Sequence, residues 1–190
     1  MRKSFRFTSL NLIGCCLLAA TSTFAIAQAA PAKPAVGTVI SPAQMYDRQL
    51  SGMEKEIVGA AEAMPADKFN FAPTQGEFKG VRTFAGQVKH LAAANYYFFH
   101  DTTKPFKDPE ADIEKLTSKE DIVKALKDSF AVAHAYISGI TVANAFVMTE
   151  NGTRSGTATM ALAHSMDHYG QMVEYLRMNG IVPPASRGGM

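Results

Sequence analysis

Two histidines, His164 and His168, stand four residues apart in the run HSMDHYGQMVEYLRMNG near the end of the chain. Residues four apart on an α-helix lie one turn apart on the same face, so both imidazoles can reach one metal ion. Ala161 and Met172 share this face, which therefore points toward a core. Burying two imidazoles among apolar side chains costs desolvation energy twice. This cost favours a metal ion bound by both histidines over two unrelated core histidines.

A third ligand has to come from elsewhere, because zinc-type centres use at least three protein ligands. His90 adjoins the apolar stripe of its own helical segment, whereas His134 falls in line with Phe130 and Ile137. His100 stands where a helix is expected to end, and we interpret it as a solvated cap. The burial pattern favours His90, with His134 as the open alternative.

A three-histidine centre with one open position would lower the pKa of bound water or act as a Lewis acid toward an anion or thiolate. Its imidazoles must be neutral, so metal affinity should fall as the pH drops. Gln87, one turn before His90, and Tyr169 are the candidates for orienting ligands or substrate. Asp167 and Glu174 are out of register with the histidine face, so no general base is assigned.

Helical periodicity predicts the elements that position these residues, and no segment alternates with period two over a useful length. Ser41-Pro42-Ala43-Gln44 is a capping box, and Pro65 ends the helix that begins there. Helices are predicted at 42–64, 83–99, 117 or 118 to 140, and 155–179. The fold class is therefore all-α, as a four-helix bundle with loops long enough for neighbours to run parallel or antiparallel.

The first 27 residues have the pattern of a signal peptide. Arg2, Lys3 and Arg6 precede a short apolar core at 10–20, and Ala25-Ile26-Ala27 is a small-x-small cleavage site. A membrane-spanning helix is the rival interpretation, but the apolar run is too short and is interrupted by polar residues. The run before Cys15 resembles a lipobox, although the apolar core continues past this cysteine. We therefore expect an exported protein, periplasmic or secreted, without a stable membrane span after cleavage.

Cleavage after Ala27 changes the composition of the chain. Lys+Arg falls from 19 to 16 against 17 Asp+Glu, so the formal charge goes from +2 to −1. A nearly neutral protein lacks the clustered positive charge that binds nucleic acid. Both cysteines, Cys15 and Cys16, leave with the signal, which excludes disulfides and cysteine catalysis. The mature chain then divides into a flexible Ala- and Pro-rich lead-in at 28–40, one domain at 41–184 and a tail at 185–190.

One histidine in the second predicted helix, followed by HxxxH and Tyr-Gly-Gln in the last, resembles the DinB-like (YfiT-like) family of metal-dependent proteins. The stretch FNFAPTQGEFKGVRTFAGQVKHL, residues 69–91, is similar to the segment before that family's first metal histidine. The resemblance covers about residues 41–184. It implies an up-down-down-up bundle, frequent homodimers and a divalent metal, zinc or nickel, held by His90, His164 and His168.

Three function classes stay open on this basis. The first is a metal-dependent hydrolase or transferase, acting outside the cytoplasm on a small molecule. The second is a non-catalytic binding or stress protein whose metal site is structural or vestigial. The third is a plain helical bundle whose histidines hold no metal. The sequence contains no nucleophile elbow, P-loop or dinucleotide fingerprint, which leaves substrate and reaction undefined.

Overall fold

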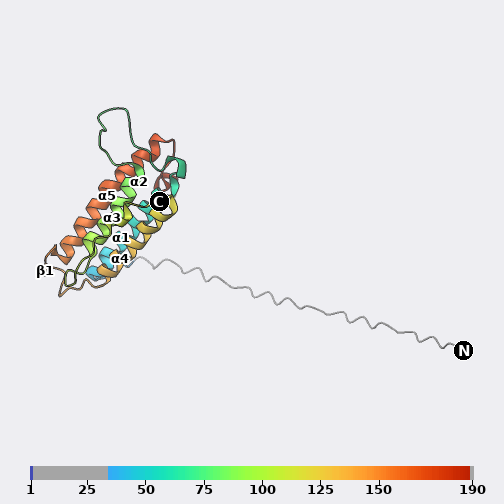
Figure 1. Cartoon of the computed structure of the whole chain (residues 1–190). Helices are drawn as coiled ribbons and strands as arrows, with labels where there is room; N and C mark the ends of the chain where they lie inside the picture. Colours follow the sequence, from blue (N-terminus) through green and yellow to red (C-terminus); the bar gives the residue numbers. More distant parts are fainter. Residues whose placement is uncertain (2–33, 189–190) are drawn as a thin grey trace. The chain divides into compact units, whose positions relative to one another are not determined.

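The computed structural model describes Met1 and residues 34–188, and Figure 1 draws the whole chain. Apart from Met1, the expected signal peptide at 1–27 lies outside the described residues. Val39–Met190 is a compact unit that contains every described helix. Its elements are α1 (Pro42–Ala63), the 3-10 turn η1 (Ala66–Lys68), α2 (Phe84–Phe99), α3 (Glu110–Ile113), α4 (Lys119–Ser138), β1 (Met148–Thr149), β2 (Gly152–Thr153), α5 (Arg154–Met178) and η2 (Pro184–Ser186).

The all-α prediction is confirmed, because the described part of the chain has one two-stranded sheet of two residues per strand. Each long helix starts at a side-chain cap. Ser41 and Gln44 form the predicted capping box, and Thr83, Ser118 and Thr153 each accept a hydrogen bond from the backbone N–H three residues on. These caps satisfy N–H groups that a helix leaves without partners.

The four long helices lie alongside one another in Figure 1, with α1 and α2 each packed on α4 and α5. Their apolar faces form one core. Its largest fully buried side chains are Phe84, Phe130, Leu50, Ile57, Met64, Leu91, Ile122, Leu126, Ile137, Ile140, Met172 and Leu176. None of the described helices combines the length and apolarity that crossing a membrane requires.

Two short elements occupy segments that the sequence predicted as loops. The four-residue helix α3 begins where Asp108 Oδ1 accepts a hydrogen bond from Glu110 N at 2.9 Å, and Ile113 anchors it in the core. The β1–β2 hairpin turns at Glu150 and Asn151, and Gly152, the first residue of β2, has a φ of +93° that suits glycine. Both elements are too short for periodicity to predict.

Candidate metal centre

The three histidines singled out in the sequence meet between α2 and α5. His164 and His168 lie one turn apart on α5, and His90 faces them from α2. Each offers one nitrogen, and these nitrogens lie within 4.8 Å of one another. His168 is buried, whereas His90 and His164 are partly exposed. We call these residues the histidine triad.

Short contacts between ring nitrogens define the triad. His164 Nε2 lies 3.2 Å from His90 Nε2 and 3.2 Å from His168 Nε2. The ring centroids of His90 and His168 are 4.7 Å apart. Two imidazole ligands at zinc–nitrogen distances of about 2.0–2.1 Å in a tetrahedral arrangement have their nitrogens about 3.3 Å apart. The observed spacing therefore fits three nitrogens around one cation.

Hydrogen bonds between the imidazoles do not explain all of these short nitrogen–nitrogen contacts. His164 Nε2 faces two other nitrogens, and one imidazole proton on it can bond only one of them. His164 Nδ1 is the buried side-chain polar atom without a hydrogen-bond partner among the described residues. Within the described residues no acceptor faces Nδ1 of His164, and with the imidazole proton on that atom Nε2 presents a lone pair to the other two histidines. Three converging lone pairs are what a cation requires, so the triad could hold a metal ion.

A chain of side-chain amides orients His168. His168 Nδ1 donates to Gln87 Oε1 at 2.6 Å, which leaves the Nε2 lone pair directed at the triad. Gln87 Nε2 then donates to Gln171 Oε1 at 2.7 Å, and Gln171 Nε2 donates to Asp167 Oδ2 at 3.3 Å. Gln87 is only 2% exposed, so this bond is shielded from water. Ligating histidines commonly donate their second N–H in this way.

The electrostatics of the site favour neutral imidazoles. The pKa of His90 and the pKa of His168 are each lowered from 6.5 to about 4, and the pKa of His164 is also lowered. Burial is the largest cause for all three, and the positive charge of Arg82 acts in the same direction. Asp167 partly opposes the shift for the two histidines of α5. A neutral imidazole is the form that binds a metal.

The two other histidines considered in the sequence lie elsewhere. His134 is half-buried between α4 and α1, with Nδ1 2.6 Å from Asp47 Oδ1 and Nε2 3.1 Å from Glu54 Oε2. His100 is the C-cap of α2, where its Nδ1 lies 2.7 Å from Tyr97 O. The structure thus brings His90, and not His134, to the pair on α5.

Tyr169 is buried on α5, and burial is the main cause of its raised pKa, followed by the charge of Glu56 on α1. Within the described part of the chain, no hydrogen bond joins Tyr169 to the triad. Its role as an orienting group stays a prediction. Gln171 was not predicted, although it stands seven residues after His164 and three after His168, on the same side of the helix.

A pocket of about 310 Å³ adjoins the triad. His90 and His164 line it, together with Tyr97 and Phe98 from α2 and with Asp108 and Glu110 at the start of α3. We call it the triad pocket. His168 is not among its lining residues, so one side of the triad opens to the pocket and the other is closed by α2 and Gln87. Periodicity did not predict the pocket, because its outer wall belongs to the short helix α3.

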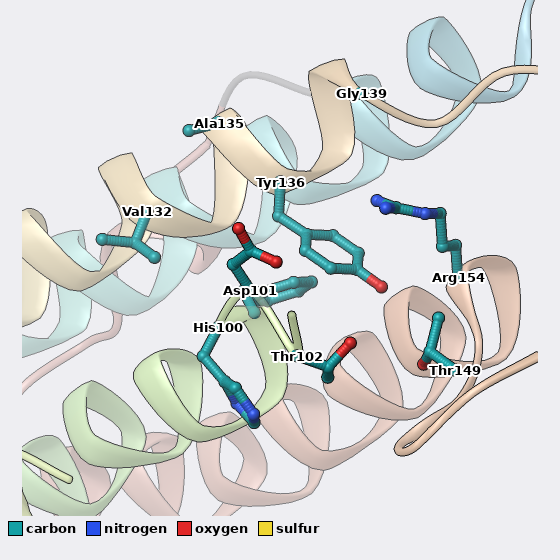
Figure 2. A pocket seen from close by; sticks show the side chains of 10 residues that line it. His100, Asp101, Thr102, Val132, Ala135, Tyr136, Gly139, Thr149 and Arg154 are labelled. Atoms are coloured by element: carbon teal, nitrogen blue, oxygen red, sulfur yellow. The ribbon is translucent and has the colours of Figure 1, made fainter. Parts of the chain in front are cut away.

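A second and larger cavity, about 420 Å³, lies away from the triad. Figure 2 shows its wall, which comes from the end of α2, from α4 and from the region where α5 starts. Arg154 lies over the ring of Tyr136, 5.5 Å from its centroid. No member of the triad lines this cavity, so its size alone does not make it the functional site.

Comparison with known proteins places the chain in a family. The sequence profile described as DinB superfamily matches residues 49–172, which include the whole triad and most of α1 to α5. No curated protein matches the chain significantly. The match covers well over half of the sequence and agrees with the resemblance seen in the order of the histidines. The chain therefore belongs to the DinB superfamily.

Proposed function

We propose that this protein binds one divalent metal ion through His90, His164 and His168 and uses it as a hydrolase or transferase. The observation that carries the proposal is the convergence of three Nε2 atoms, with His164 Nε2 at 3.2 Å from each of the other two. The lowered pKa values of the three imidazoles support it, because the ligands need no deprotonation at neutral pH.

Zinc or nickel is the metal we propose. Three imidazole nitrogens without a thiolate or carboxylate in the set suit these ions, whereas magnesium and calcium prefer oxygen ligands. A divalent ion held there would supply Lewis acidity at a position that three protein ligands leave open. Gln87 holds His168 in the ligating orientation, and His90 and His164 border the pocket through which a small molecule would enter.

We also propose the up-down-down-up order for the bundle. Tyr46 near the start of α1 donates to Ser155 O at the start of α5, which supports a parallel pair. Asn95 donates to Ser129, and Phe99 lies against Tyr136, so α2 and α4 advance together. Gln87 early in α2 meets His168 late in α5, which supports an antiparallel pair.

For location and assembly, the proposal rests on the sequence. Residues 1–27 would direct export to the periplasm or outside the cell, and the mature chain would act on a small molecule there. The near-neutral charge after cleavage argues against nucleic acid as a partner. Family resemblance favours a homodimer. N-terminal sequencing of the protein recovered from its native compartment would test cleavage after Ala27.

Metal analysis tests the site itself. Tag-free protein should contain about one zinc or nickel per chain, as expected for a single set of three protein ligands. His164→Ala should lose this metal while keeping its helical circular dichroism, and His100→Ala, a histidine outside the triad, should retain it. Retention of stoichiometric metal by His164→Ala would exclude the proposed ligand set.

A second measurement separates an enzyme from a protein with a structural metal. In the cobalt-substituted protein, azide should change the visible spectrum if a coordination position is open. A spectrum that azide leaves unchanged would favour the non-catalytic binding or stress protein. The His164→Ala variant, which should hold no cobalt in the triad, provides the control for nonspecific effects of azide.

A further inference from the structure

The triad pocket has an apolar wall beside the histidines. Phe98 packs edge-on against His164, with ring centroids 5.4 Å apart, and lies on α2 one residue after Tyr97. Tyr97 is 55% exposed, and its ring is 6.5 Å from that of Phe106, which stacks on His100 at 4.3 Å. Large aromatic side chains left open to solvent around a pocket mark a surface suited to an apolar group.

The triad pocket also has an acidic wall, formed by residues at the start of α3. Asp108 and Glu110 both line it, and neither side chain is buried. Asp108 Oδ1 accepts a hydrogen bond from the backbone N–H of Glu110, and no salt bridge in the described part of the chain engages either carboxylate. The lining residues include no lysine or arginine. Anionic groups are therefore disfavoured at this wall, whereas an ammonium group would gain two carboxylates and neighbouring aromatic faces.

The polarity of the pocket orients a ligand. Its histidine end would face a divalent cation if the proposed function is correct, and a cation repels an ammonium group. The carboxylate end attracts the same group. A volume of about 310 Å³ suits a small molecule.

We propose that the triad pocket binds a small organic amine with an apolar body. The body lies against Phe98 and Tyr97, the ammonium group lies at Asp108 and Glu110, and the uncharged end points to His90 and His164. The position of the uncharged end rests on the proposed metal site, whereas the preference for a cation rests on the pocket wall alone.

Three probes of one shape test the charge preference: benzylamine, benzyl alcohol and benzoate. Binding is measured by titration in nuclear magnetic resonance, with zinc-free and zinc-loaded protein side by side. Benzylamine should bind about five- to tenfold more tightly than benzoate, as expected for a cation near two solvent-accessible carboxylates. The preference should shrink as salt is raised. Equal or tighter binding of benzoate overturns the proposal.

Variants assign the preference to its residues. The double variant Asp108→Asn with Glu110→Gln should bind benzylamine and benzoate about equally. Asp112→Asn, an acidic residue on α3 outside the pocket lining, is the matched control and should keep the preference. Phe98→Ala should weaken all three probes together, because it removes the apolar wall. An equal loss of the preference in Asp112→Asn and in the double variant would refute the assignment.

Zinc loading distinguishes this inference from the proposed function. With the ammonium group at α3, zinc should change the affinity for benzylamine by less than about threefold, since the two charges are separated and screened. Displacement of benzylamine by zinc would overturn the proposed orientation. A protein that binds no metal but prefers benzylamine would refute the metal proposal and leave the pocket inference standing. A protein that binds the metal but does not prefer benzylamine would refute only the pocket inference.

Discussion

His168 Nδ1 donates a hydrogen bond of 2.6 Å to Gln87 Oε1, across the interface of α5 and α2. This bond places the proton of His168 on the nitrogen that faces away from the triad. Because Gln87 is almost fully buried, water does not replace it as the acceptor. The relationship couples the packing of two helices to the orientation of one candidate ligand.

Replacing Gln87 should weaken metal binding without removing it. In Gln87→Leu, His168 loses the acceptor that fixes its ring, and the affinity for zinc should fall about 10- to 100-fold. Competition against a chromophoric chelator measures the change. Gln171→Leu is the control one bond further along the chain of amides and should lose much less. An unchanged affinity in Gln87→Leu would show that packing alone orients His168.

The metal-free protein should lose stability as the pH falls from 6.5 toward 4. Burial lowers the pKa of His90 and of His168 to about 4, so the unfolded chain binds more protons than the folded chain in this window. The free energy of unfolding therefore decreases as the pH is lowered. Urea denaturation at pH 7.5 and pH 5.0 measures the fall. His90→Gln should show a smaller fall, and a fall equal to that of the unsubstituted protein would contradict the assignment.

His134 should act as a pH-dependent link between α4 and α1. Burial lowers its pKa, but the hydrogen bonds and charges of Asp47 and Glu54 together outweigh this and raise it above 6.5. The stabilisation is therefore complete below pH 6.5 and is lost as the pH rises through the raised pKa.

His134→Ala should then cost about 1 kcal/mol at pH 6, given the partial exposure of all three side chains, and less at pH 9. Urea denaturation at both pH values provides the test. Lys127→Ala, which breaks the exposed pair with Glu62 between the same two helices, should cost less than about 0.5 kcal/mol. Metal content should be unaffected in either variant. A cost that does not depend on pH would indicate lost packing instead.

A buried hydrogen bond joins α2 and α4. Asn95 Nδ2 donates to Ser129 Oγ at 3.0 Å, and Ser129 Oγ donates to Leu126 O at 2.7 Å. Ser129→Ala should leave the buried amide of Asn95 without a partner and cost about 1–3 kcal/mol. Thermal or urea denaturation checks this value. In the double variant with Asn95→Leu, the cost should be smaller than the sum of the two single costs, and strict additivity would mean that the bond contributes little.

The sequence was sufficient for the four long helices and for two of the three histidines of the triad. Caps at Ser41, Thr83 and Ser118 are local chemistry, so the starts of three helices could be predicted to within two residues. The fourth was expected near Ser155 and begins at Arg154. The spacing of His164 and His168 likewise guarantees that they share a face of one helix, because residues four apart on an α-helix lie about one turn apart.

Residues on different helices meet only through packing, which periodicity does not specify. His90 and His134 both adjoin apolar stripes, yet α2 turns His90 toward α5, and α4 turns His134 toward the carboxylates of α1. Without the family resemblance, the sequence left that choice open. The hydrogen bond from His168 to Gln87 and the acidic wall at α3 depend in the same way on how the helices pack and on the path of the loops that connect them. Tertiary structure decided them, because His90 and His164, separated by 74 residues, come together only when the faces of two helices pack in one particular rotation.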